Sequence, residues 1–229
     1  MKKCLFCLNN YKTLTKEHIF PKSWYPDNFS DEKWKIYSCE ECNSGFGKAE
    51  QEILIKVGVC SDPNSHQAKK AIRSITSIFG KNVRDKTARW KKACNLLSEL
   101  IPLSNLSAKP FPNFGLHEGY PIESQRAIYL PKQLDDIGKK FIKGIEYKLE
   151  NRIIDQRKDD LKIYFCHEKD VQGVNKLIKT YGKRYDIAPG IIFWRASGID
   201  ERKLNMLYKF SIWDKLIIYG SLFTSVKND

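Results

Sequence analysis

The sequence has no long hydrophobic run and no segment that resembles a targeting signal. No stretch of about 18 or more apolar residues is present that would cross a bilayer, and the amino terminus, MKKCLFCLNN, lacks an apolar segment of signal-peptide length. Internal repeats and low-complexity tracts are also absent. These absences argue against a membrane protein and a repeat protein. We therefore expect a cytoplasmic protein without a membrane partner.

Acidic residues are in short supply relative to basic ones. The chain has 27 Asp and Glu residues against 40 Lys and Arg residues, which gives a formal net charge of +13 and an isoelectric point near 9.3. Such a balance attracts polyanions and makes their association fast and sensitive to salt. Nucleic acid is therefore the leading candidate partner. Charge that serves only solubility is the alternative, and charge by itself specifies no reaction.

The first sixty residues differ in character from the rest of the 229-residue chain. The short apolar run WKIYS suits a strand, and a helical period of apolar residues starts at Phe46 and continues to Val57. The turn cluster SDPNS then follows. We predict one module at residues 1–60 and a second domain, for target or partner binding, at residues 61–229.

The second domain is predicted to consist of a helical segment and an α+β unit. Two amphipathic helices are expected between about Ser65 and Leu100, and a third from about Pro131 to Leu149. A helix over Val171 to Tyr181 follows. Aromatic and β-branched residues in GIIFWRASG, LNMLYKFSIWD and LIIYGSLF then predict an antiparallel sheet. The expected fold class is α+β.

Four of the seven cysteines form two CxxC pairs, Cys4 with Cys7 and Cys39 with Cys42. Each pair presents two thiolates at the separation that a tetrahedral Zn²⁺ requires. A redox pair or simple packing is the alternative, but in a reducing compartment this arrangement favours metal binding over disulfides. Because four thiolates leave no open coordination position, we expect a structural zinc ion that takes no part in catalysis.

The segments EHIFPKSW and CEECNSGFGKAE lie between and after these pairs. They contain Glu17 and His18 followed by Ile-x-Pro, and a CxxC pair followed directly by Asn43. In this order, the features resemble the HNH, or ββα-metal, nuclease family in its zinc-ribbon variety. The resemblance covers about residues 1–57. It implies a zinc-stapled ββα module with the acid–histidine pair on a short strand and the asparagine at the start of a helix.

The resemblance implies a metal-dependent endonuclease that hydrolyses phosphodiester bonds in DNA. His18 would be the general base, a role that the ordinary histidine pKa of about 6.5 suits at neutral pH. Glu17 and Asn43 would bind one Mg²⁺ or Mn²⁺ through oxygen atoms. Gly47 stands where some members have another ligand, so water would complete the metal shell. Neighbouring residues of a strand point to opposite faces, so Glu17 and His18 need a local bend or different roles.

Five basic residues are candidate contacts for nucleic acid. Lys22 and Lys48 flank the motif segments, whereas Lys69, Lys70 and Arg73 lie in the first predicted helix of the second domain. A solvated helix surface is the alternative for these side chains.

These features predict two alternative functions. The first is the DNA endonuclease described above; a small HNH protein with a second domain is typical of restriction or anti-phage defence effectors, which predicts a partner ATPase or sensor protein. The alternative is a zinc-ribbon module that binds nucleic acid without cutting it.

Overall fold

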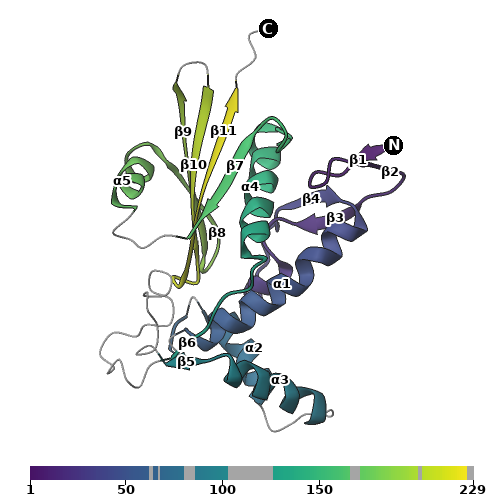
Figure 1. The fold of residues 1–229 in the computed structure, drawn as a ribbon, viewed down its shortest axis with the longest axis vertical. Helices are drawn as coiled ribbons and strands as arrows, with labels where there is room; N and C mark the ends of the chain where they lie inside the picture. Colours follow the sequence, from purple (N-terminus) through teal and green to yellow (C-terminus); the bar gives the residue numbers. More distant parts are fainter. Residues whose placement is uncertain are drawn as a thin grey trace.

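The computed structural model describes residues 1–61, 64–66, 68–79, 86–102, 126–165, 171–200 and 203–225. These ranges form a mixed α+β structure with a five-stranded antiparallel sheet and several two-stranded pairs. Figure 1 shows the large sheet at one end of the molecule and the helices α2 and α3 at the other. The predicted α+β class is confirmed. None of the described helices combines the length and apolarity needed to cross a membrane.

The amino-terminal part consists of two short strand pairs and a long helix. Strand β1 (Lys2–Lys3) pairs with β2 (Asn10–Tyr11), and β3 (Thr15–His18) pairs with β4 (Lys35–Ser38), both antiparallel. The helix α1 (Glu40–Val59) follows β4 directly. The segment that carries Glu17 and His18 is therefore a strand, as predicted, and it lies in a β–β–α order.

Helix α1 begins at the second cysteine pair. Cys39 is its N-cap, and the Cys39 sulfur accepts a hydrogen bond from the backbone N–H of Cys42 at 3.4 Å. Glu40 and Glu41 place negative charge in the first turn, where the helix dipole favours it. The cysteine spacing thus fixes both the start of the helix and the geometry of its thiols.

The 3₁₀ turn η1 (Lys22–Trp24) lies between β3 and β4. After α1 the chain continues through α2 (Lys69–Phe79), α3 (Lys86–Ser98), β5 (Ile101–Pro102) and β6 (Arg126–Ala127). The two helices predicted between residues 65 and 100 are present. Helix α2 packs along α1, so its basic residues lie close to the amino-terminal part.

The carboxy-terminal part is built on the five-stranded sheet, whose order is β7-β11-β10-β9-β8. Its strands are β7 (Asp160–Tyr164), β8 (Lys183–Ala188), β9 (Ile191–Asp200), β10 (Lys203–Ile212) and β11 (Leu216–Ser225). All neighbouring strands are antiparallel. The predicted antiparallel sheet is therefore confirmed, although β8 had no counterpart among the predicted strands.

Two helices cover opposite faces of this sheet (Figure 1). Helix α4 (Leu134–Glu150) packs on β7 and β11, and α5 (Gln172–Tyr181) packs on β9 and β10. Along β10 the side chains alternate between the faces, as the strand period requires. Tyr208 joins the large core beneath α4, whereas Leu207 packs in the smaller cluster beneath α5.

One apolar core joins the amino-terminal elements to α4 and the sheet. The ring of Phe20 lies 4.8 Å from that of Phe141, and the ring of Trp24 lies 5.2 Å from that of Trp213, measured between centroids. All four side chains are buried. The predicted domain boundary at residue 60 therefore falls inside a shared core, and the division into two domains stays a prediction.

Candidate functional site

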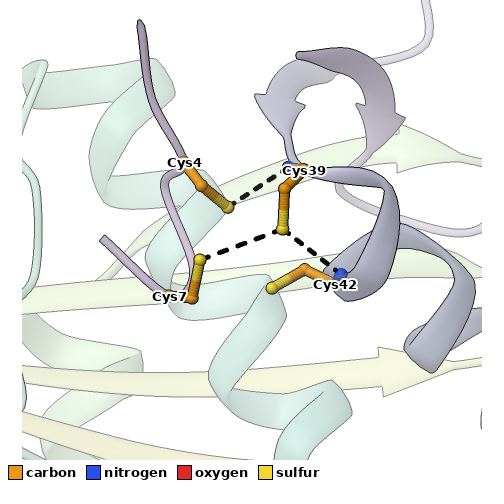
Figure 2. A group of neighbouring side chains, drawn as sticks. All are labelled: Cys4, Cys7, Cys39 and Cys42. Carbon is orange, nitrogen blue, oxygen red and sulfur yellow. Dashed lines mark hydrogen bonds between the residues drawn. The ribbon is translucent and has the colours of Figure 1, made fainter. Parts of the chain in front are cut away.

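The four paired cysteines lie together beside the start of α1 (Figure 2). Their sulfur atoms are all within 4.8 Å of one another, and those of Cys7 and Cys39 are 3.9 Å apart. A tetrahedral zinc ion with bonds of about 2.3 Å places its sulfur ligands about 3.8 Å apart. The cluster can therefore hold a zinc ion with small adjustments of the side chains.

Hydrogen bonds orient these thiols. The backbone N–H of Cys39 donates to the sulfur of Cys4 at 3.3 Å, and the Tyr11 hydroxyl lies 3.6 Å from the sulfur of Cys7. Such outer contacts fix the direction of metal ligands. Burial raises the pKa of Cys4 and of Cys42, so metal binding must displace protons from the cluster and should weaken as pH falls.

A second feature is a hollow of about 480 Å³ at the end of β3, which we call the His18 hollow. It is open to solvent, and β3, η1, α1 and α2 each contribute residues to it. Its lining consists of Glu17, His18, Pro21, Lys22, Ser23, Glu50 and Lys70. The structure thus brings together two predicted catalytic residues and two predicted nucleic-acid contacts.

His18 is the last residue of β3 and is half-buried. Its pKa is lowered below the ordinary value of 6.5 by burial, and also by nearby positive charges, first of Lys35 and then of Lys140. Lys35 stands opposite His18 in the β3–β4 pair. The lowered pKa favours the neutral imidazole, which is the form that accepts a proton.

Glu17 does not lie free in the hollow. Its buried carboxylate forms an ion pair with Lys140 of α4, and the Lys140 ammonium also pairs with Glu50 of α1. Burial raises the pKa of Glu50, although Lys140 opposes that change. Sequence reasoning missed both Glu50 and Lys140. Glu50 lies two helical turns after Asn43 and could have been considered, but nothing local in the sequence marks Lys140 as its partner.

Asn43 lies in the first turn of α1 and contacts β3. Its side-chain amide donates to the Thr15 hydroxyl at 3.1 Å, near the opposite end of the strand from His18, and it does not line the hollow. Among the described residues, the four cysteines form the only group of three or more Cys, His, Asp or Glu side chains whose ligand atoms lie close enough to share one ion. A divalent ion held by Glu17 and Asn43 stays a prediction.

The predicted nucleic-acid contacts differ in their surroundings. Lys70 and Arg73 both pair with Asp27, at 2.6 Å for the Arg73 guanidinium. Lys48 and Lys69 are exposed on their helices and do not line the hollow. Part of the positive charge of α2 is thus neutralised inside the molecule, which charge counting along the sequence does not show.

Comparisons of the chain with models of protein families, with curated protein sequences and with solved structures gave no match. The resemblance to HNH nucleases therefore rests on the motif residues and their order.

Proposed function

We propose that the chain is a metal-dependent endonuclease of the HNH type that hydrolyses phosphodiester bonds in DNA. The observation that carries this proposal is the position of His18 in an open hollow that Lys22 and Lys70 also line, where burial and nearby lysines lower its pKa. A base and cations side by side are what phosphodiester hydrolysis needs. The cysteine cluster supports the proposal as a structural zinc site that holds β1, β2 and the start of α1.

The chemistry assigned to the hollow is attack of water on a phosphodiester. The water oxygen forms a bond to phosphorus, its proton passes to the imidazole of His18, and the bond to the leaving oxygen breaks. Lys22 attracts the phosphate and offsets its negative charge, and Lys70 does so when it exchanges its ion pair with Asp27 for the phosphate. The Mg²⁺ or Mn²⁺ that the family resemblance implies would supply further charge neutralisation when bound.

A zinc-containing module that binds nucleic acid without cutting it is the second candidate. The ion pair between Glu17 and Lys140 favours it, because a carboxylate held by an internal cation is less available to a metal ion. The presence of His18 in the hollow favours the nuclease, since a binding module has no evident need for a general base there.

A plasmid assay separates the two candidates. We expect purified protein to convert supercoiled plasmid to nicked or linear DNA in the presence of Mg²⁺ or Mn²⁺, and to stop doing so in EDTA, because the ion offsets charge at the phosphate. Zinc content measured before and after the EDTA step controls for loss of the structural metal. Intact plasmid with both ions, from protein that binds DNA, would assign the chain to the non-catalytic candidate.

The pH dependence of cleavage follows from the lowered pKa of His18. A protonated imidazole cannot take a proton from water, so activity is lost when the pH falls below the pKa of His18. Because that pKa lies below 6.5, we expect cleavage to persist at pH 6.5 and to decline only at lower pH. Cleavage rates measured over a pH series at a saturating concentration of the metal ion test this decline. A decline centred above 6.5 would contradict the assignment.

The salt dependence of DNA binding tests the cations of the hollow. The double variant Lys22→Gln with Lys70→Gln should bind DNA more weakly and lower the log–log salt slope by about 2, because each phosphate contact contributes about 0.9. The matched control is Lys176→Gln with Lys179→Gln, two exposed lysines of α5. Equal slopes for the two double variants would show that DNA does not enter the hollow.

We propose a restriction or anti-phage defence effector as the biological setting, with a partner ATPase or sensor protein that controls cleavage. The genes adjacent to the one that encodes this chain provide the first check. Co-purification with such a neighbour, and a change in the cleavage rate of the purified chain when the neighbour is added, is the expected result.

A further inference from the structure

Lys140 is a buried cation from α4 that reaches the amino-terminal elements. Its side chain is fully buried, its ammonium pairs with both Glu17 and Glu50, and it lies 5.1 Å from the centre of the Phe46 ring. The family resemblance places a divalent ion beside Glu17. In this structure a positive charge is already there, and the chain itself provides it.

The backbone of α4 is fixed against the segment that follows the histidine. A Cβ atom at Gly144 would lie 2.8 Å from the side chain of Ile19, so the helix approaches this segment as closely as a glycine allows. One turn away, the Phe141 ring packs against Phe20 in the core. Helix α4 therefore cannot withdraw without opening the core, so a separation of the Lys140 ammonium from the two carboxylates requires a change in its side-chain conformation.

A second hollow offers the Lys140 side chain an alternative place. This α1–α4 groove has a volume of about 340 Å³, and Lys140 lines it together with Gly45, Ala49 and Asp136. Asp136 is exposed, lies one turn before Lys140, and has no ion-pair partner among the described residues. Residues four apart on a helix can pair, and a lysine side chain is long and flexible enough to do so.

We propose that Lys140 regulates metal entry to the His18 hollow: its ammonium and a divalent ion occupy the place between Glu17 and Glu50 in turn. Two cations cannot share these carboxylates closely without strong repulsion. Entry of the metal ion therefore moves the ammonium into the α1–α4 groove toward Asp136. The inference rests on the proposed function for its biological purpose, whereas its test needs no DNA.

The test is a Mn²⁺ titration of the zinc-loaded full chain, followed by electron paramagnetic resonance, without nucleic acid. Lys140→Met keeps the length of the side chain and removes its charge, so it should bind Mn²⁺ at least about tenfold more tightly than wild type. The matched control is Lys56→Met. Lys56 is a buried lysine of α1 that also pairs with two carboxylates, those of Glu52 and Glu99, but it lines neither hollow. This control should bind Mn²⁺ as wild type does.

Two further variants test the residues assigned to this exchange. Adding Glu50→Gln to Lys140→Met should remove the gain in affinity, and Asp136→Asn alone should weaken Mn²⁺ binding because the displaced ammonium loses its partner. Equal Mn²⁺ affinity in wild type and Lys140→Met, or no binding by either, would overturn the proposal.

A measurement on the wild-type chain covers the case in which Lys140→Met does not fold. Acetylation by acetic anhydride, followed residue by residue with mass spectrometry, should modify Lys140 several-fold faster in millimolar Mn²⁺ than in its absence, with the buried Lys56 as internal reference. An unchanged rate at Lys140 contradicts the exchange.

The outcome also separates this inference from the proposed function. If Mn²⁺ displaces the Lys140 ammonium but the chain leaves plasmid intact, the inference about Lys140 holds and the proposed nuclease function fails. Plasmid cleavage with equal Mn²⁺ affinity in wild type and Lys140→Met would do the reverse.

Discussion

Replacing His18 with alanine is expected to lower plasmid cleavage by about 10²- to 10⁴-fold, the usual contribution of a general base. The change removes the group that accepts the proton from water. It does not remove a zinc ligand, and the half-buried position of His18 at the edge of β3 limits the loss of packing. Zinc content, thermal stability and DNA affinity should therefore remain near their wild-type values, which assigns the loss to the chemical step.

The matched control for this variant is His66→Ala. His66 is an exposed histidine outside the His18 hollow, so cleavage should be unchanged. The check is the single-turnover rate at which each variant forms nicked plasmid, measured at the same metal concentration. Activity of purified His18→Ala within a few fold of wild type would exclude His18 as the base.

Replacing Cys39 with serine is expected to remove the zinc ion and to unfold the first sixty residues. Structural zinc contributes on the order of 10 kcal/mol to the folding of small modules. Cys39 is a buried member of the cluster and the N-cap of α1. Because serine is itself a preferred N-cap, the helix start retains a capping group and the loss reports mainly on the metal.

The control for the cysteine variant is Cys94→Ser, since Cys94 is an exposed free cysteine of α3 outside the cluster. It should keep both zinc and stability. Elemental analysis and circular dichroism measure the two variants in parallel. Freshly purified wild-type protein that contains no zinc would remove the four-cysteine metal site.

Local patterns allowed the cysteine cluster and the helices to be predicted from the sequence. The spacing of each CxxC pair sets the position of two thiols within one turn, and apolar periodicity marks α1 and α4 without knowledge of the rest of the chain. Strand β8 was missed because its residues KRYDIA include few of the apolar side chains that mark a strand.

Contacts between distant residues explain what could not be predicted. Glu17 and Lys140 are 123 positions apart, and no pattern in either segment indicates the other. Likewise, the sequence of α2 shows that the helix carries several basic residues. It does not show that two of them, Lys70 and Arg73, pair with Asp27, which is more than forty positions away. Burial and pairing of charged groups are properties of the fold and are not readable from composition.

Because of the shared core, the amino-terminal sixty residues cannot be separated from the rest of the protein as a stable fragment. Phe20 and Trp24 belong to the part with the predicted catalytic residues, but they are covered by Phe141 and Trp213 from beyond residue 60. A fragment that ended at residue 60 would expose these rings to water and would be prone to aggregate. The motif segment therefore cannot be transplanted alone into another protein, and a functional graft would have to include α4 and the sheet.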